Sequence, residues 1–205
     1  MMMTLRRVKQ TMLTGVIVAG GQNRRMEGKV KALLPFHGEA VIVRQIREMQ
    51  KTCDRIVVVA RDPRLFSHVA DHNVQIIEDR IPGKGPLSGM HAAFSELDRA
   101  AAWVVGCDMP FISEEAAQLM WERKQEKGCD AVVPYIAGRI HPLHGIYDKR
   151  CLEPATDLLQ SGDYRLTDLL DRLQWDTVQE EVFVRKGIDC RFGINMNTPE
   201  QYRAA

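Results

Sequence analysis

Short apolar runs rich in β-branched residues alternate with stretches of helical periodicity through the first two-thirds of the chain. Four runs have the length and composition of buried strands, at residues 15–19, 55–60, 74–77 and 102–106. Between and after them, helices are predicted over residues 41–51, 88–101 and 113–127. Strand–helix–strand alternation of this kind predicts right-handed crossovers and a mainly parallel sheet with helices on both faces.

The pattern changes after Gly128. Two apolar runs, at residues 131–135 and 143–147, flank Ala137-Gly138-Arg139, which has the composition of a turn, so a β-hairpin is predicted there. Two short helices are expected near residues 151–160 and 166–173. The segment Thr198-Pro199-Glu200-Gln201 then combines an N-cap threonine, a proline at the first helical position and a glutamine that can close a capping box.

Length and composition are typical of one globular unit. The chain has 205 residues, of which 45% are hydrophobic and 27% charged, so it can build a sizeable core. No repeat, low-complexity tract or linker divides it. We therefore predict a single domain over residues 14–205, with a flexible N-terminal extension over residues 1–13. Its nucleotide-binding part would cover about residues 14–127, and its substrate side about residues 128–205.

Charge and cysteine content exclude several classes of protein. The 28 Lys and Arg residues nearly balance the 27 Asp and Glu residues, which argues against a nucleic-acid binder or a polybasic membrane protein. No apolar run approaches the roughly 18 residues of a membrane span, and the first residues lack the apolar core of a signal peptide. The five cysteines are scattered, without a CxxC pair, which indicates neither a disulfide framework nor a zinc site. A cytoplasmic location is expected.

The loop after the first predicted strand has the composition of a phosphate-binding loop. In an open α/β sheet, ligands bind outside the carboxyl ends of the strands. Residues 20–31 contain paired glycines, which let backbone N–H groups approach an anion, and four cations. These residues are Gly20, Gly21, Arg24, Arg25, Lys29 and Lys31. The loop matches neither GxxxxGK[ST] nor GxGxxG, and a glycine-rich turn with solvated cations is the alternative.

Two further loops carry candidate chemistry. Asp108, in Cys107-Asp108-Met109-Pro110, directly follows a predicted strand, where a carboxylate beside a phosphate loop could hold Mg²⁺. The alternative is an ordinary turn aspartate. Asp79 precedes a Gly- and Pro-rich segment, residues 82–89, that leads into a helix whose N-terminus could receive an anion. That segment could equally be a tight strand-to-helix connection.

Together these segments resemble a known family. Val18-Ala19-Gly20-Gly21, followed by Arg25-Met26 and Lys31, resembles the signature of the GT-A-type nucleotidyltransferases. Within that group the chain resembles the molybdenum cofactor guanylyltransferase family, through residues 85–89, residues 107–110 and Asn195-Met196-Asn197-Thr198-Pro199. The resemblance covers about residues 14–202. It implies a Rossmann-like, three-layer α/β/α fold with a small β-hairpin and helix elaboration in the C-terminal third.

The resemblance implies transfer of GMP from GTP to the terminal phosphate of molybdenum-molybdopterin, with release of pyrophosphate. The attacking phosphate is already ionised, so no general base is needed. By the resemblance, Asp108 holds Mg²⁺, Lys31 stabilises charge at the α-phosphate and Arg25 assists the leaving pyrophosphate. GTP would also contact Val18, Ala19, Gly20, Gly21 and Asp79, the last through guanine or ribose. Asn195 and Asn197 would bind molybdopterin, and other cofactor-biosynthesis proteins and molybdoenzyme-specific chaperones are expected partners.

The sequence departs from the family pattern at three positions, and two other functions stay open. Glu27 stands where relatives usually have glycine, Ser88 replaces a common alanine, and Arg61 stands where an asparagine is expected. The nearest alternative is a cytidylyl- or sugar-phosphate nucleotidyltransferase, against which the C-terminal asparagine pair argues. The other is a non-catalytic GTP-binding carrier, which would not need both Lys31 and Asp108.

Overall fold

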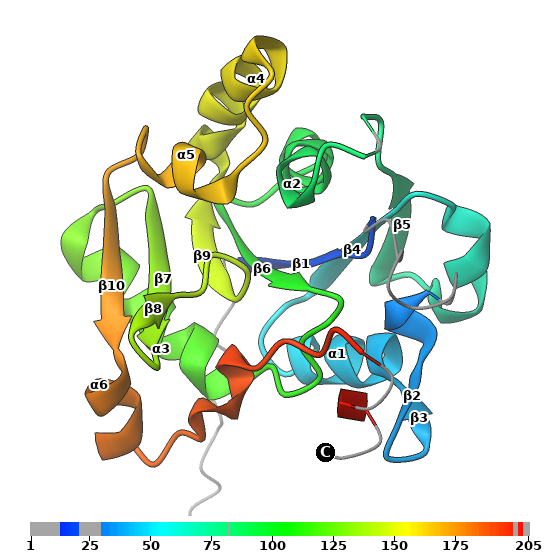
Figure 1. Ribbon diagram of the computed structural model, residues 1–205, viewed down its shortest axis with the longest axis horizontal. Coiled ribbons are helices and arrows are strands. Elements are labelled where there is room, and N and C mark those ends of the chain that lie inside the picture. The colour runs from blue at the N-terminus through cyan, green and yellow to red at the C-terminus, as the bar shows by residue number, and fades with distance from the viewer. Residues whose placement is uncertain (1–12, 21–29, 82, 199–200, 203–205) are drawn as a thin grey trace, which may run out of the picture.

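The structure, a computed structural model, describes residues 13–20, 30–81, 83–198 and 201–202 (Figure 1). Residues 1–12 of the predicted extension lie outside the described residues. Leu13, which we assigned to that extension, is instead the first residue of strand β1 and is 2% exposed. The folded part of the chain therefore includes at least one residue before the predicted boundary, because the Leu13 side chain is part of the apolar core.

Four parallel strands form one half of the central sheet, and they match the four predicted strands to within two residues at either end. Strand β1 lies between β6 and β4, with Ile17 beside Val105 on one side and Val58 on the other, and β5 pairs with β4. The bounds are β1 Leu13–Val18, β4 Arg55–Ala60, β5 Val74–Glu78 and β6 Ala101–Gly106. The carboxyl ends of all four strands therefore meet at one edge.

The C-terminal strands extend this same sheet, in the order β10-β7-β9-β6-β1-β4-β5, with β8 paired to β7. The two arms of the predicted hairpin correspond to β7 and β9, which pair antiparallel. The turn predicted at residues 137–139 instead connects β7 to an additional short strand, β8, which includes Arg139, and Ala137 and Gly138 both have positive φ. Strand β9 pairs antiparallel with β7 and with β6, and β10 pairs parallel with β7. The bounds are β7 Ala131–Ile136, β8 Arg139–Ile140, β9 Gly145–Asp148 and β10 Trp175–Gln179, and a separate pair joins β2 Pro35–Phe36 to β3 Glu39–Ala40.

Helices cover both faces of the sheet, so the predicted three layers are confirmed (Figure 1). Helices α1, α3 and α6 pack on one face, and α2, α4 and α5 pack on the other. The α-helices are α1 Val41–Met49, α2 Pro86–Ser95, α3 Glu114–Lys127, α4 Leu152–Ser161, α5 Leu166–Leu170 and α6 Glu180–Arg185. Short 3₁₀ helices are η2 Lys31–Leu33, η3 Pro63–Val69, η4 Lys149–Cys151 and η5 Cys190–Gly193. Within the described ranges, no helix combines the length and apolar character needed to cross a membrane.

Local signals explain where two of these helices begin and end. As predicted, the Ser113 side chain caps α3 by accepting a hydrogen bond from the Ala116 N–H at 3.1 Å, and Gly128 ends that helix with a φ of 64°. Helix α2 begins earlier than predicted, since Pro86 occupies its first turn after Gly85 at a φ of 74°. It also ends earlier, at Ser95, because Ala101 is already a buried residue of β6.

Candidate active site

The predicted site residues lie on loops at the carboxyl edge of the parallel strands. Val18 is the last residue of β1 and is followed by Ala19 and Gly20. Asp79 follows β5, and Asp108 lies two residues beyond the end of β6. Gly21, Arg25 and Glu27 lie outside the described residues, so the phosphate loop enters the described structure again only at Val30.

Three predicted residues from distant parts of the chain meet at this edge. The Lys31 ammonium donates a hydrogen bond to Asn197 Oδ1 at 2.7 Å, and its Nζ lies 3.7 Å from Asp108 Oδ2. The side chains of Lys31 and Asp108 are 18% and 19% exposed. This contact joins the residue expected at the GTP α-phosphate to a residue expected on the molybdopterin side.

The negative charge of the Asp108 carboxylate is only partly compensated by neighbouring groups of the protein. Burial raises the pKa of the Asp108 carboxyl above its ordinary value, and the neighbouring Lys31 ammonium opposes that rise without cancelling it. A carboxylate in this state gains from any further cation that approaches it. Among the described residues, no three His, Cys, Asp or Glu side chains gather as a metal site. Asp108 suits Mg²⁺, which is commonly bound by one or two carboxylates together with substrate phosphates.

A buried glutamine fixes the backbone on both sides of Asp108. Gln45 of α1 is fully buried and donates from Nε2 to the carbonyls of Gly106 at 2.8 Å and Met109 at 2.9 Å. Our sequence analysis did not single out Gln45. The available signal was a polar residue on the face of the helix that also carries Ile42, Ile46 and Met49.

Asp79 is buried against the start of the phosphate loop. It is 3% exposed, and a Cβ added to Gly20 would lie 3.0 Å from Asp79 Oδ2, so only a glycine fits there without displacement. Asp79 Oδ2 accepts from the Ser88 hydroxyl at 2.9 Å, and Oδ1 accepts from the Ile81 N–H at 3.1 Å. Ser88 thus ties Asp79 to helix α2.

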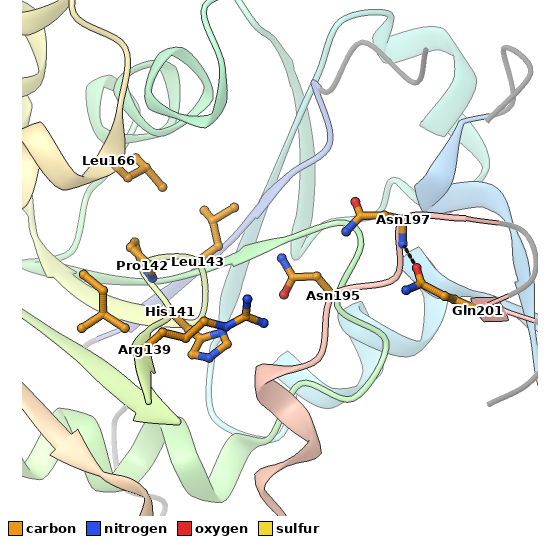
Figure 2. Close-up of a pocket in the computed structure, with 9 residues that line it drawn as sticks. Arg139, His141, Pro142, Leu143, Leu166, Asn195, Asn197 and Gln201 are labelled. Atoms are coloured by element: carbon orange, nitrogen blue, oxygen red, sulfur yellow. Dashed lines mark hydrogen bonds between the residues drawn. The ribbon is translucent and has the colours of Figure 1, made fainter. Parts of the chain in front are cut away.

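The C-terminal segment crosses the site with alternating side chains. Met196 is 2% exposed and packs beside Phe36, Val41 and Tyr202, while Asn195 and Asn197 line the opposite side together, as their spacing predicts (Figure 2). The Met196 N–H donates to the Asp108 carbonyl at 2.7 Å. The segment is therefore tied directly to the loop that carries Asp108.

A pocket of about 470 Å³ opens between the C-terminal segment, the β8–β9 connection and α5, and its lining includes Asn197, the hydrogen-bond partner of Lys31 (Figure 2). Its lining has one cation and no carboxylate among the described residues: Arg139, Ile140, His141, Pro142, Leu143, Leu166, Asn195, Asn197 and Gln201. Burial lowers the pKa of His141, so that imidazole is neutral at physiological pH. The Arg139 backbone belongs to the β7–β8 ladder, whereas its guanidinium makes no hydrogen bond or ion pair with another described residue. The lining suits a ligand that carries negative charge and polar ring edges.

Comparison with known proteins agrees with this architecture. Residues 15–178 match the family described as MobA-like NTP transferase domain. A probable molybdenum cofactor guanylyltransferase from Pelotomaculum thermopropionicum is 34% identical over 91% of this chain and 88% of its own, and one from a Geobacillus species is 31% identical over 93% and 96%.

A solved structure has the same fold. It is the molybdopterin-guanine dinucleotide biosynthesis protein A from Archaeoglobus fulgidus, which superposes with a TM-score of 0.80 at 22% identity and covers 94% of this chain and 96% of its own. At that identity the match supports the fold alone, whereas the family match and the more similar relatives extend over most of the sequence. The chain belongs to the MobA-like NTP transferase family.

Proposed function

We propose that this protein transfers GMP from GTP to the terminal phosphate of molybdenum-molybdopterin and releases pyrophosphate. The relatives described above are named probable molybdenum cofactor guanylyltransferases, which supports this choice of substrates. The observation that carries the proposal is the contact of Lys31 with Asn197, 2.7 Å long, beside Asp108. It places one cation between the loop expected to bind the triphosphate and the pocket suited to the cofactor.

The nucleotide is proposed to bind along the carboxyl ends of β1 and β5. Val18, Ala19, Gly20 and Gly21 would contact it through the backbone, as the close approach of Gly20 to Asp79 favours. Both Asp79 oxygens already accept a hydrogen bond, but each has a second lone pair that can accept from guanine or ribose. Molybdopterin is proposed to occupy the pocket, with Asn195, Asn197 and Arg139 offering donors to its polar edge and phosphate.

The proposed reaction is an in-line displacement at the α-phosphorus. A cofactor phosphate oxygen forms a bond to that phosphorus, and the bond from the α-phosphorus to the bridging oxygen of the β-phosphate breaks. The electron pair leaves with pyrophosphate, and no proton has to move. Catalysis then consists of positioning and charge compensation. Lys31 would compensate charge on the α-phosphate and Arg25 on the leaving pyrophosphate. Asp108 would hold a divalent cation, proposed to be Mg²⁺, whose charge would offset that of the triphosphate.

We further propose that the enzyme acts in the cytoplasm and passes its product to other cofactor-biosynthesis proteins or to molybdoenzyme-specific chaperones. A reducing compartment agrees with the five free cysteines, of which Cys53, Cys107, Cys129 and Cys151 are buried. Burial raises the pKa of these four thiols, which keeps them unreactive. They serve as small apolar side chains of the core.

The test of the proposed function is pyrophosphate release with molybdenum-molybdopterin and each of the common nucleoside triphosphates in turn. We expect turnover with GTP and little with ATP, CTP or UTP. Turnover with CTP equal to that with GTP would instead indicate the sibling cytidylyltransferase activity. Tight GTP binding without pyrophosphate release would indicate a carrier.

A further inference from the structure

We infer that Gln201 is a positioning residue for guanylyl transfer, and that it acts through Asn197 on the Lys31 ammonium. This inference rests on the proposed function, because it assigns Lys31 to the α-phosphate. Gln201 does not bond to Lys31 directly, because its partners are Asn197 and Thr198. It holds the segment that supplies the hydrogen-bond acceptor of Lys31, and it lines the cofactor pocket at the same time.

The contacts form a continuous chain from Gln201 to Lys31. Gln201 Oε1 accepts from the Asn197 N–H at 2.5 Å (Figure 2). It also accepts from the Thr198 N–H at 3.1 Å, and the Gln201 N–H donates to Thr198 Oγ1 at 3.4 Å. This is the reciprocal capping box that the sequence predicts. The Gln201 side chain does more than in a simple capping box, because its Oε1 also accepts a hydrogen bond from the backbone N–H of Asn197, the residue before the N-cap. The Asn197 side chain then accepts from Lys31 Nζ.

The neighbouring residues are anchored independently, which leaves Asn197 as the point that Gln201 controls. Met196 is tied to the Asp108 carbonyl through its N–H, and its side chain is buried beside Phe36 and Val41. Tyr202 is buried in the same cluster on the other side of Gln201. Loss of the Gln201 amide would therefore release Asn197 without unfolding the segment.

Gln201 also connects this chain of contacts to the cofactor pocket. Its Oε1 is engaged by the two backbone N–H groups, while its Nε2 makes no hydrogen bond with a described residue and belongs to the pocket lining. A phosphate or pterin oxygen in the pocket could accept from that Nε2. Cofactor binding would then fix the same amide that positions Asn197, so the pocket and the Lys31 ammonium would be ordered together.

The experiment compares Gln201→Ala with Ser113→Ala in the full chain. Both changes remove a helix-capping hydrogen bond, but Ser113 hydrogen-bonds with His144, Glu115 and Ala116 rather than with Lys31 or Asn197. We expect Gln201→Ala to lower kcat about tenfold, a change of about 1.4 kcal/mol in the barrier, while KM for GTP stays within about threefold. Ser113→Ala should lower the melting temperature and leave kcat unchanged. An unchanged kcat in Gln201→Ala would overturn the inference.

Two further variants separate positioning from a structural role. Gln201→Glu keeps an oxygen at the Oε1 position, so kcat should recover while the added charge raises KM for the anionic cofactor. In an Asn197→Ala background, Gln201→Ala should cause no further loss of kcat, because the side chain through which Gln201 acts on Lys31 is already removed, whereas loss of the Gln201 Nε2 donor should still raise KM for the cofactor. Losses that multiply in the double variant would contradict action through Asn197.

A readout without turnover keeps this inference distinct from the proposed function. The rate at which an amine-specific acylating reagent modifies Lys31 can be followed by mass spectrometry of the nucleotide-free protein. Gln201→Ala should raise that rate and Ser113→Ala should leave it as in the wild type. If the wild type fails to transfer GMP, the proposed function is wrong, but the modification rates still show whether Gln201 controls Lys31. Equal rates in all three proteins would contradict that control.

Discussion

Two lysine–aspartate pairs beside the central sheet differ in how completely the protein compensates their charges. Lys124 of α3 and Asp148 of β9 lie 2.9 Å apart, with side chains 7% and 14% exposed. Lys31 and Asp108 lie 3.7 Å apart at the carboxyl edge, and the shorter contact of Lys31 is with the neutral amide of Asn197. The residue types are the same, but the neighbouring groups that surround each aspartate and lysine differ.

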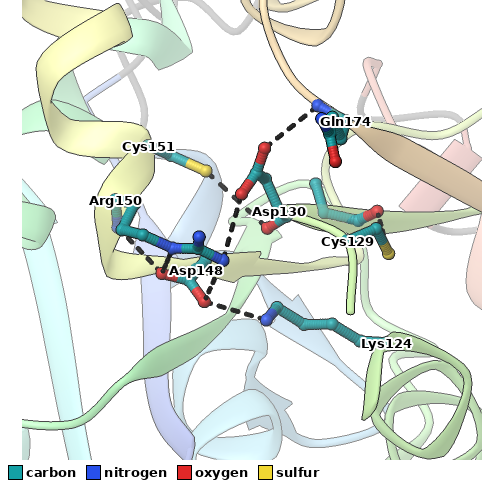
Figure 3. Close-up of polar contacts among 8 residues, drawn as sticks. Lys124, Cys129, Asp130, Asp148, Arg150, Cys151 and Gln174 are labelled. Atoms are coloured by element: carbon teal, nitrogen blue, oxygen red, sulfur yellow. Dashed lines mark hydrogen bonds and ion pairs between the residues drawn. The ribbon is translucent and has the colours of Figure 1, made fainter. Parts of the chain in front are cut away.

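The Lys124–Asp148 pair belongs to a network that satisfies every charge within it (Figure 3). Arg150 donates to Asp148 Oδ1 from Nε at 3.0 Å and from its backbone N–H at 3.0 Å, and it also pairs with Asp130 at 3.1 Å. Burial alone would raise the pKa of Asp148, but the hydrogen bonds from Arg150 and Lys124 outweigh it and hold that pKa at about 2. This aspartate is fully committed to protein partners.

Asp108 shows the opposite balance. Its pKa is raised because burial outweighs the attraction of Lys31. A carboxylate that the protein leaves under-compensated favours a cation from outside, and a lysine held by an amide remains available to a phosphate. Incomplete charge compensation, rather than the presence of a Lys–Asp pair, is therefore what distinguishes the proposed active-site edge from the Lys124–Asp148 contact.

The sharpest test of this difference is to neutralise each aspartate. Asp108→Asn should lower turnover at least about a hundredfold, the usual scale for loss of a charge-stabilising group, and should weaken the dependence on Mg²⁺. Asp148→Asn should leave the turnover of the folded enzyme unchanged. Steady-state pyrophosphate release over a range of Mg²⁺ concentrations measures both. A folded Asp108→Asn variant with wild-type Mg²⁺ dependence would remove that residue from the proposed metal site.

Truncation of the two lysines should also separate activity from stability. Lys31→Ala should lower kcat by roughly tenfold to a hundredfold with little change in melting temperature, because a partly exposed loop lysine adds little stability. Lys124→Ala should cost about 2 kcal/mol of unfolding free energy by leaving a buried carboxylate less well paired, with turnover retained. Denaturant unfolding measures the loss of unfolding free energy in each variant, and steady-state kinetics of the same proteins measures kcat. A large loss of stability in Lys31→Ala, with activity lost in proportion, would favour a structural role for Lys31.

The opposite pKa shifts of the two aspartates predict opposite effects on stability. A lowered pKa means that Asp148 stabilises the fold fully above its unfolded value of about 3.9, and that this contribution is lost as the pH falls towards about 2. A raised pKa means that ionised Asp108 destabilises the fold at neutral pH. Asp148→Asn should therefore unfold more easily than wild type near neutral pH, and Asp108→Asn less easily. Both differences should shrink in acid, and thermal unfolding across the acidic range measures them.

Replacement of either C-terminal asparagine should have the smallest effect on GTP affinity, and the two replacements should differ in kcat. Asn195 lines the pocket and makes no contact with Lys31, so Asn195→Ala should keep GTP affinity within about threefold, or roughly 0.7 kcal/mol, and weaken molybdopterin-dependent turnover. The sequence predicts the same for Asn197→Ala. The contact with Lys31 adds a loss of kcat for Asn197 that Asn195 should not share. Calorimetric GTP titration measures the affinities, and lost GTP binding in Asn195→Ala would place this segment on the nucleotide side.

Elements with strong local signals could be predicted from the sequence, and elements fixed by tertiary contacts could not. The four parallel strands are mainly apolar runs rich in β-branched residues, and α3 carries both a serine cap and a terminal glycine. Strand β10 has the sequence Trp-Asp-Thr-Val-Gln, in which only Val178 is buried, so no apolar run marks it. It forms because β7 offers an edge for parallel pairing.

The same distinction applies to the site. Lys31, Asp108 and Asn197 could each be proposed from a motif in the sequence, because each motif has a fixed place in the family resemblance. Their mutual contacts could not, since they join residues that are far apart in the sequence and depend on how the C-terminal segment crosses the sheet. Gln45 was missed for a related reason, as its role depends on two carbonyls of another loop.

The most direct test of guanylyl transfer is to incubate radiolabelled GTP with the protein, molybdenum-molybdopterin and Mg²⁺, and to follow where each labelled phosphate goes. The proposed displacement predicts that a radiolabel in the α-phosphate enters the cofactor product and that a label in the γ-phosphate leaves as pyrophosphate. Asp148→Asn should show the same pattern, and Asp108→Asn should show almost no transfer. Release of the α-label as GDP or free GMP, with none in the cofactor, would contradict guanylyl transfer at this edge of the sheet.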